Sequence, residues 1–346
     1  MCFVNSLLPL RILAVTNILP APDAPHLGRF VEQQIKALQR IGLEIDVLYV
    51  NRREDGMRVY AGLPALLRKS VGRTKPNLVH VMYGGIMSQI ARHVIRDRPV
   101  IVTFHGSDLL GQPFERPLRR LLAASGVLAS RQAAKKCDGI IVVAEHLLEK
   151  LPQNIPSSRV QVIPCGIDLE LFKPLDQKHC REQLGWDEDA FHVLFQATGD
   201  PVKRPELASA AVERLREQGV KVELHYLRGV EYEQVPVWLN ASDALLVTSH
   251  HEGSPTIVKE SLACNLPIVS VPVGDIARMI QGVEGCYLSH PDALELAARL
   301  QKVRIHTARI AGRARAHDIS ADHCAGRLVQ FYKQVVNGFV GSCGSS

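Results

Sequence analysis

The sequence predicts an α/β protein built from two doubly wound domains, each a parallel sheet with helices on both faces. Short apolar, β-branched runs alternate with amphipathic stretches along nearly the whole chain, a pattern typical of parallel sheets. The pattern starts a second time after a turn-rich run near Gly166. In addition, 346 residues are too many for one ordinary core and enough for two.

The predicted first domain spans residues 1–166 and the second spans residues 167–321. The expected strands of the first are Arg11–Thr16, Ile45–Val50, Leu78–Met82, Val100–Phe104 and Gly139–Val143. Those of the second are Val193–Gln196, Val222–Tyr226, Ala244–Thr248 and Pro267–Val271. An amphipathic stretch, Phe30–Ile41, follows the first strand and predicts a helix. A last helical pattern, at about residues 322–340, is expected to pack back on the first domain.

The composition excludes several classes of protein. Hydrophobic residues make up 46% and charged residues 22%, which is the balance of a soluble globular protein. No run of 18 apolar residues suggests a membrane-spanning helix. The first positive charge, Arg11, follows the N-terminal apolar run rather than preceding it, so that run is a poor signal peptide and a cytoplasmic location is expected. The 8 cysteines form no closely spaced pair, which indicates neither structural zinc nor a disulfide framework.

The two halves of the chain differ in charge. Residues 1–165 contain 22 Lys+Arg and 12 Asp+Glu, whereas the remainder contains 19 and 23. The basic first half is therefore expected to meet an anionic partner. A cluster in residues 116–136 mixes leucines with Arg116, Arg119, Arg120, Arg131, Lys135 and Lys136. This segment could be an ordinary solvated face or could lie on anionic lipid. No aromatic-basic interleaving suggests nucleic acid.

Two glutamates with seven residues between them follow the expected strand at residues 244–248. Glu252 opens a loop, Gly253 and Ser254 continue it, and a helix is expected to begin near Pro255 and to contain Glu260. Gly253 permits close approach of a ligand to the backbone. The free N–H groups of the first helical turn, at Thr256, Ile257 and Val258, would form an anion site. From spacing alone, Glu252 and Glu260 are equally well explained as ordinary helix-end acids.

This stretch resembles the two-glutamate signature of retaining glycosyltransferases with the GT-B fold, in the large family 4. By resemblance, Glu252 contacts the donor sugar, Glu260 holds the ribose, and the helix start between them takes the diphosphate. The shortened form of the second domain, with the wording of residues 202–208 and 251–267, is most similar to transferases of teichuronic-acid and related cell-surface polysaccharides. The resemblance covers nearly the whole chain and implies two Rossmann-like domains facing across a cleft.

Two segments of the first domain fit the same family. Residues 14–30 resemble its first glycine-bearing loop, which has a single glycine here, Gly28, that could also be a simple helix cap. Residues 102–108 place His105 just after a strand, beside a glycine. A lone histidine is usually structural, but the resemblance implies that His105 reaches the donor sugar.

In the second domain, residues 197–207 resemble the family's phosphate-binding loop, with Lys203 as its lysine and Arg204 beside it. Thr198 stands where relatives commonly have an arginine, so Arg204 could supply that charge or Lys203 could act alone. A solvated basic pair at a helix start is the plain alternative, although the helix dipole disfavours cations there. Arg228 and Gly229, after the next expected strand, are candidates near the base.

No metal is expected, because the chain has no well-placed Asp-x-Asp and cationic side chains are expected near the phosphates. Asp187 and Asp189 form a literal Asp-x-Asp, but they follow a Leu-Gly-Trp turn and are interpreted as structural. No cofactor is expected besides the nucleotide sugar, which is a co-substrate.

The resemblance implies a retaining, hexosyltransferase-like enzyme that moves a sugar from a nucleoside diphosphate to a hydroxyl of a saccharide or lipid-linked acceptor. His105, Glu252 and Lys203 are the expected catalytic residues. The alternatives left open are a non-catalytic nucleotide-sugar-binding subunit of a polysaccharide assembly complex, and an epimerase or hydrolase on the same plan. The enzyme is expected to be cytoplasmic, with a possible peripheral place on the inner face of the membrane.

Overall fold

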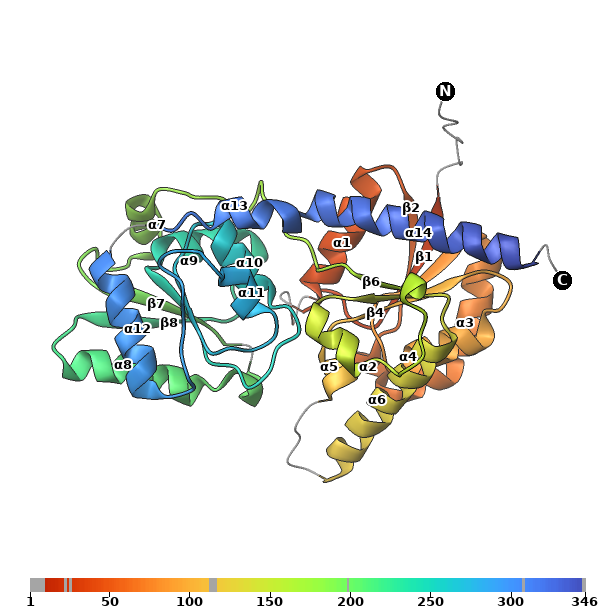
Figure 1. The fold of residues 1–346 in the computed structure, drawn as a ribbon, viewed down its shortest axis with the longest axis horizontal. Coiled ribbons are helices and arrows are strands. Elements are labelled where there is room, and N and C mark those ends of the chain that lie inside the picture. Colours follow the sequence, from red (N-terminus) through yellow and green to blue (C-terminus); the bar gives the residue numbers. More distant parts are fainter. Residues whose placement is uncertain are drawn as a thin grey trace. The chain divides into compact units, whose positions relative to one another are not determined.

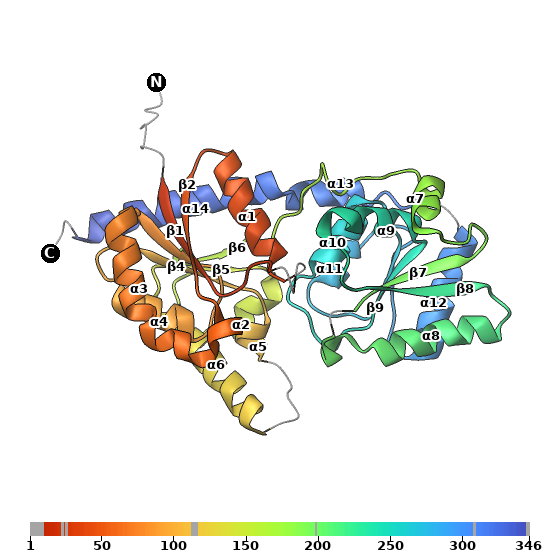
Figure 2. The ribbon, with the colours of Figure 1, turned by 180° about the vertical axis from the view of Figure 1, so that it is seen from behind.

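The computed structural model describes residues 10–21, 24, 27–111, 117–197, 199–306 and 309–343. Their contacts divide into two compact units. Unit 1 holds the described residues of 1–20, 27–166 and 322–346, and unit 2 those of 21–26 and 167–321. Each unit has one parallel sheet with helices on both faces, which confirms the predicted fold class (Figures 1 and 2). Within the described part of the chain, no helix is long and apolar enough to cross a membrane.

Unit 1 contains a six-stranded sheet in the order β2-β1-β3-β4-β5-β6. Its strands are β1 (Arg11–Thr16), β2 (Glu44–Tyr49), β3 (Leu78–Val81), β4 (Val100–Phe104), β5 (Gly139–Val142) and β6 (Val160–Val162). Its α-helices are α1 (Arg29–Arg40), α2 (Arg52–Asp55), α3 (Val59–Thr74), α4 (Ile86–Val94), α5 (Ser107–Leu110), α6 (Pro117–Lys136) and α14 (Ala321–Cys343). Short 3₁₀ turns are η1 (Gly56–Arg58), η2 (Glu145–Lys150) and η3 (Ser157–Arg159). The short strand β6 has too few residues for its pattern to be recognised in the sequence.

Helix α14 packs on the sheet of unit 1 through two aromatic side chains. Tyr332 is fully buried, and its hydroxyl lies 2.7 Å from Nδ1 of His80, whose Nε2 lies 2.7 Å from Oγ1 of Thr103. Phe331 lies against Gly139, where a Cβ would come within 3.1 Å of the ring. The glycine in β5 therefore makes room for the last helix.

Unit 2 contains a five-stranded sheet in the order β11-β10-β9-β7-β8. Its strands are β7 (Phe191–Gln196), β8 (Val222–Leu227), β9 (Ala244–Val247), β10 (Ile268–Ser270) and β11 (Tyr287–Leu288). Its α-helices are α7 (Gln177–Leu184), α8 (Pro205–Glu217), α9 (Val235–Ala241), α10 (Thr256–Ala263), α11 (Ile276–Ile280), α12 (Ala293–His306) and α13 (Arg313–Ala316). Short 3₁₀ turns are η4 (Pro201–Lys203), η5 (Tyr232–Gln234) and η6 (His317–Ile319).

The inner strands of unit 2, β7, β9 and β10, are buried on both faces, which explains their largely apolar runs. Val193 and Phe195 belong to a core shared with α8 and α12, whereas Leu194, between them, belongs to a core shared with α9, α10 and α11. Because β7 and β9 are parallel neighbours in this sheet, their carboxyl ends open onto the same edge of it (Figure 1). Ligands of open α/β sheets bind at this edge.

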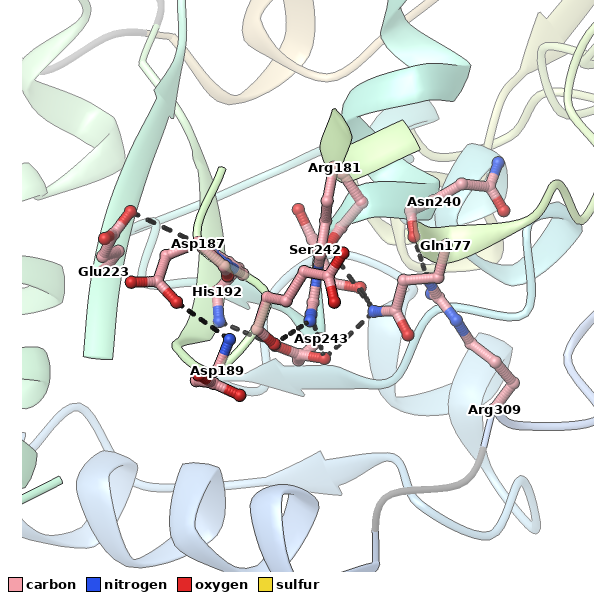
Figure 3. A network of polar contacts seen from close by, with 12 residues as sticks. Gln177, Arg181, Asp187, Asp189, His192, Glu223, Asn240, Ser242, Asp243 and Arg309 are labelled. Atoms are coloured by element: carbon pink, nitrogen blue, oxygen red, sulfur yellow. Dashed lines mark hydrogen bonds and ion pairs between the residues drawn. The ribbon is translucent and has the colours of Figure 1, made fainter. Parts of the chain in front are cut away.

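The opposite edge of the same sheet is held by the carboxylate of Asp243, just before β9. Its Oδ1 accepts hydrogen bonds from Arg181 at 2.7 Å and from Gln177 at 3.0 Å, and its Oδ2 accepts one from the backbone N–H of His192 at 2.7 Å (Figure 3). Charge-assisted bonds of this kind fix the start of β7 against β9 and α7. The polar groups at this edge are therefore mostly structural.

Candidate active site

Lys203 and Glu252 meet at the carboxyl edge of the unit 2 sheet. Nζ of Lys203 lies 2.6 Å from Oε1 of Glu252, and the same oxygen accepts a hydrogen bond from Oγ of Ser249 at 2.7 Å. Gln196, the last residue of β7, accepts a second bond from Nζ at 3.3 Å. Both charged side chains are largely buried, with exposed fractions of 17% and 14%. Two residues expected to act separately, on phosphate and on sugar, thus form one ion pair.

Arg204 connects the loop before α8 to the loop after β9. It adopts a left-handed backbone conformation (φ 53°), and its Nε and Nη2 donate to the carbonyl oxygens of Thr248 and Ser249. Oγ1 of Thr248 in turn donates to the carbonyl of Lys203 at 2.7 Å. The guanidinium therefore binds backbone carbonyls in the loop wall, which leaves Lys203 as the better-placed cation for a phosphate. Thr198, which stands where the resemblance implies an arginine, lies outside the described residues.

Helix α10 begins at Thr256, with Pro255 as its N-cap rather than inside its first turn. No side chain caps the helix, so the N–H groups of Thr256 and Ile257 are not bound by a capping side chain. Gly253 packs against Gly274, where a Cβ would lie only 2.8 Å from the Gly253 carbonyl. The uncapped start of a helix, beside a close glycine contact, has the properties of an anion site.

A second loop, after β10, supports the start of α10. Oγ of Ser254 donates to Oδ2 of Asp275 at 2.7 Å. Oδ1 of Asp275 is buried and has no hydrogen-bond partner within the described residues. A buried acceptor without a partner is costly, so this oxygen is available to a ligand hydroxyl. Sequence reasoning did not select Asp275, although the Val-Gly-Asp turn after a strand was a signal for it.

Glu260 lies inside α10 with only 4% of its surface exposed. Its Oε1 accepts a hydrogen bond from the hydroxyl of Tyr232 at 3.2 Å. Burial raises the pKa of the Glu260 carboxyl to about 7, even though the Tyr232 bond lowers it. An acidic group buried in this way is typical of a functional site rather than of a solvated helix face. Arg228 and Gly229, by contrast, are exposed after the end of β8.

Gly28 of unit 1 is required by its surroundings. It is the N-cap of α1 and has a φ of 72°, which favours glycine. A Cβ there would lie 2.5 Å from Cγ2 of Ile18 and 2.8 Å from the backbone N of Leu19. The glycine therefore lets the start of α1 touch the loop after β1.

His105 follows β4, and its ring is fixed inside unit 1. It stacks on Tyr83, with ring centroids 5.6 Å apart, and its Nε2 lies 2.9 Å from the carbonyl oxygen of Met82. Because a carbonyl only accepts, Nε2 carries the proton. Nδ1 faces Sγ of Cys165 at 3.5 Å. The histidine is thus held in one tautomer and one orientation, while its expected contact with a donor sugar stays a prediction.

Asp108 organises the loop that carries His105. Its carboxylate accepts backbone N–H bonds at 3.0 Å each from Gly84, His105 and Gly106. Desolvation nevertheless raises the pKa of this buried carboxyl to about 6. Asp108 is a positioning residue. The sequence analysis did not select it, although it is the last residue of the segment 102–108 that resembles the family.

Replacing Asp108 with Asn is expected to destabilise the protein by about 1–3 kcal/mol, because one acceptor oxygen becomes a donor facing backbone N–H groups. Thermal melting and urea unfolding of the full chain measure this. Asp318→Asn is the control, since that side chain is 88% exposed. Equal unfolding of D108N and the wild type would show that the three backbone bonds contribute nothing.

A cavity of about 460 Å³ adjoins this loop in unit 1. Its lining includes Arg52, Tyr60, Tyr83, Ser107 and Leu122. A lining of mixed polar and apolar groups suits a small amphiphilic ligand.

Comparison with known proteins agrees with this architecture. Residues 27–171 match the family described as Glycosyltransferase Family 4, and residues 183–304 match Glycosyl transferases group 1. These two matches cover most of both units. The chain belongs to the family-4-like glycosyltransferases of the GT-B fold. Its predicted family is thereby confirmed.

Two curated relatives illustrate the similarity. The putative teichuronic acid biosynthesis glycosyltransferase TuaC of Bacillus subtilis is 23% identical over 334 residues, covering 78% of this chain and 83% of that protein. The D-inositol 3-phosphate glycosyltransferase of Geodermatophilus obscurus is 27% identical over 228 residues. That match covers 55% of this chain and spans only 51% of the relative's length.

Solved structures share the fold at low identity. Sucrose-phosphate synthase from Thermosynechococcus elongatus has a TM-score of 0.80 at 18% identity, covering 95% of this chain and all of that one (100%). HepE of Anabaena, solved in complex with UDP-glucose, has a TM-score of 0.64 at 16% identity. The match covers 96% of this chain and 100% of HepE.

Proposed function

We propose that the protein transfers a sugar from a UDP-sugar to a hydroxyl acceptor, with retention, in the synthesis of a cell-surface polysaccharide or glycolipid. The observation that carries this proposal is the Lys203–Glu252 pair beside the uncapped start of α10, with Glu260 buried farther along that helix. The UDP-glucose complex of HepE and the resemblance to TuaC support the choice of donor and product class.

The chemistry follows from where charge develops. As the glycosidic bond to the diphosphate breaks, negative charge collects on the leaving oxygens, where the ammonium of Lys203 and the N–H groups of α10 would stabilise it. Glu252, released from Lys203, can accept a hydrogen bond from a hydroxyl of the sugar while the sugar ring gains positive character. Glu260 can accept hydrogen bonds from both ribose hydroxyls. We therefore expect the leaving group to be stabilised by these groups without a metal ion.

A single assay tests the proposed function. The full chain is incubated with UDP-, GDP- and ADP-sugars, with and without a lipid-linked saccharide acceptor and with excess EDTA. We expect a thermal shift with UDP-sugars and donor consumption that depends on acceptor and persists in EDTA. Donor turnover without acceptor would indicate a hydrolase or epimerase, and binding without turnover a non-catalytic subunit. Either outcome would reject transfer.

The acceptor is proposed to be anchored in an anionic membrane that α6 contacts from the cytoplasmic side. The wall of the cavity includes Leu122 and Val127 of this helix. The same helix exposes Leu121 by 67% and Leu128 by 58%. Arg131 and Lys135, also exposed, follow on α6. Exposed leucines next to cations suit the surface of an anionic bilayer. The side chains of Arg116 and Arg119 lie outside the described part.

Replacing Leu121 and Leu128 with Asp is expected to weaken binding to vesicles containing phosphatidylglycerol by at least roughly tenfold, because apolar burial is lost and like charge is added. Vesicle co-sedimentation at two salt concentrations measures this. Leu294→Asp, at a leucine of unit 2 that is 62% exposed, is the matched control. Equal binding of all three proteins to anionic and neutral vesicles would show that α6 is only a solvated face.

A further inference from the structure

Three side chains with metal-binding atoms converge at the start of β7 and β8, away from the donor residues. Nδ1 of His192 lies 2.8 Å from Nε2 of His225, and Oε2 of Glu223 lies 3.7 Å and 3.4 Å from these two nitrogens. Among the described residues, this is the group of His, Cys, Asp and Glu side chains whose ligand atoms all fall within 4.8 Å of one another.

The sheet itself creates the cluster. In the parallel pairing of β7 with β8, His192 is the partner of Glu223. Glu223 and His225 are two positions apart on β8, so they share a face of the strand. Trp186, before β7, stacks on the His225 ring with centroids 3.5 Å apart and an interplanar angle of 8°. The packing of the domain therefore holds the ligand atoms in place before any ion binds.

A backbone carbonyl fixes the orientation of the buried histidine. Nε2 of His192 lies 2.6 Å from the carbonyl oxygen of Asp187, so Nε2 carries the proton. Nδ1 therefore has a free lone pair, and it faces His225 and the Glu223 carboxylate; Figure 3 shows His192 beside Glu223. Histidines that bind metals usually donate their other N–H to such a carbonyl. The Asp187 side chain does not join the cluster: it caps the backbone N–H of Asp189 at 2.9 Å and pairs with Lys221 at 2.5 Å.

We propose that His192, Glu223 and His225 bind one divalent transition-metal ion of the Zn²⁺ class. Two imidazole nitrogens and one carboxylate oxygen suit Zn²⁺ or Co²⁺, whereas Mg²⁺ and Ca²⁺ require mostly oxygen ligands. Nitrogens on a tetrahedral ion lie about 3.3 Å apart, so a small outward shift of the two rings would admit it. The side chain of Glu223 is 44% exposed, which leaves a coordination position for water.

The ion would act on stability rather than on transfer. His192 and Glu223 lie at the amino ends of their strands, whereas Lys203 and Glu252 follow the carboxyl ends of β7 and β9. Strand β8 is the edge strand of the sheet, and the ion would tie it to β7 through side chains. The site therefore differs from the donor site and does not depend on the proposed function.

The test uses the full chain, freed of any affinity tag and treated with EDTA, then titrated with ZnCl₂, CoCl₂ or MgCl₂. We expect Zn²⁺ and Co²⁺ to bind with one equivalent per chain, Co²⁺ to give visible d–d bands of a nitrogen-ligated site, and both to raise the melting temperature. At the same concentration, Mg²⁺ should neither bind with one equivalent per chain nor raise the melting temperature. Ligands that bind only the native state stabilise it according to their affinity.

Glu223→Gln and His225→Gln should each weaken Zn²⁺ binding by about 10- to 100-fold or more, since even residues behind the ligands cause losses of that size. Glu223 is half exposed, so E223Q is expected to fold, and circular dichroism checks both variants. His290→Gln is the matched control, because His290 is an exposed histidine 3.2 Å from Glu295. The proposal would be overturned if no ion bound with one equivalent per chain, or if the wild type and both cluster variants bound Zn²⁺ with equal affinity. The contact of His192 with His225 would then be only a hydrogen bond between two histidines.

Discussion

Lys203→Met and Glu252→Gln are each expected to lower kcat of sugar transfer by about 10²- to 10³-fold, the usual loss when one preorganised charge at a developing anion is removed. The two side chains lie 2.6 Å apart and share their environment with Ser249 and Gln196. Because each orients the other before the donor binds, the double variant should lose little more than either single one. Non-additivity of this kind is the signature of residues that act as a unit.

This non-additivity is tested by steady-state kinetics with a UDP-sugar and its acceptor. The wild type, both single variants and the double variant are compared. Lys178→Met is the matched control, because Lys178 also pairs with a glutamate, Glu188, at 3.2 Å, but both side chains are mostly exposed. That variant should retain full activity. Fully additive losses would show that Lys203 and Glu252 act on different steps, and unchanged kinetics would remove both from the mechanism.

Glu260→Gln is expected to weaken UDP binding and raise KM while stabilising the protein above neutral pH. Contacts to the ribose form equally in the ground and transition states, so their loss leaves kcat nearly unchanged. The stability gain follows from burial, which raises the carboxyl pKa from its ordinary value of 4.5 to about 7. The neutral acid fits the folded state, so this stability is complete below pH 4.5 and is lost as pH rises through about 7.

The sign of the effect can be measured by thermal melting of the wild type and E260Q at pH 4 and pH 8. The two proteins should melt alike near pH 4, and the variant should be more stable at pH 8 by on the order of 3 kcal/mol at most. Tyr232→Phe is the companion variant: it removes the bond that lowers the pKa of Glu260, so UDP affinity should begin to fall at a higher pH as the solution is acidified. A wild type more stable than E260Q at pH 8 would contradict the assignment.

The sequence was sufficient for the fold class, for most strands and for the start of α10. These rest on local signals: β-branched runs buried on both faces of a parallel sheet, and a glycine and a proline before a helix. The strands β6 and β11 were not predicted, because a glutamine interrupts the apolar residues of β6 and β11 has only two residues. The sequence pattern also did not show that Pro255 is the N-cap, one residue before the helix begins.

The site was predicted less completely, because its contacts join residues that are distant in sequence. The resemblance to the family indicated Lys203, Glu252 and Glu260, but not that the first two form an ion pair. The sequence also did not indicate that Tyr232, in η5, contacts Glu260, or that Asp275, in another loop, contacts Ser254. Arg204 was expected at a phosphate because of its charge, yet its guanidinium binds two carbonyls that only the folded chain brings near.

The metal-ligand cluster shows the same limit. His192 and Glu223 become neighbours only through the register of β7 with β8, and spacing along the chain resembles no zinc motif. The absence of paired cysteines argues only against a cysteine-ligated zinc, and it does not bear on a site formed by histidines and a glutamate.

The central claim is that the donor lies with its ribose at Glu260 and its sugar at Glu252. Calorimetric titration of UDP into E260Q and E252Q, in parallel with the wild type, tests this most directly. We predict that E260Q binds UDP at least about tenfold more weakly, as expected for loss of charged hydrogen bonds to the ribose. E252Q should bind UDP with nearly wild-type affinity although it transfers almost no sugar. Weak UDP binding by E252Q together with normal binding by E260Q would contradict the claim.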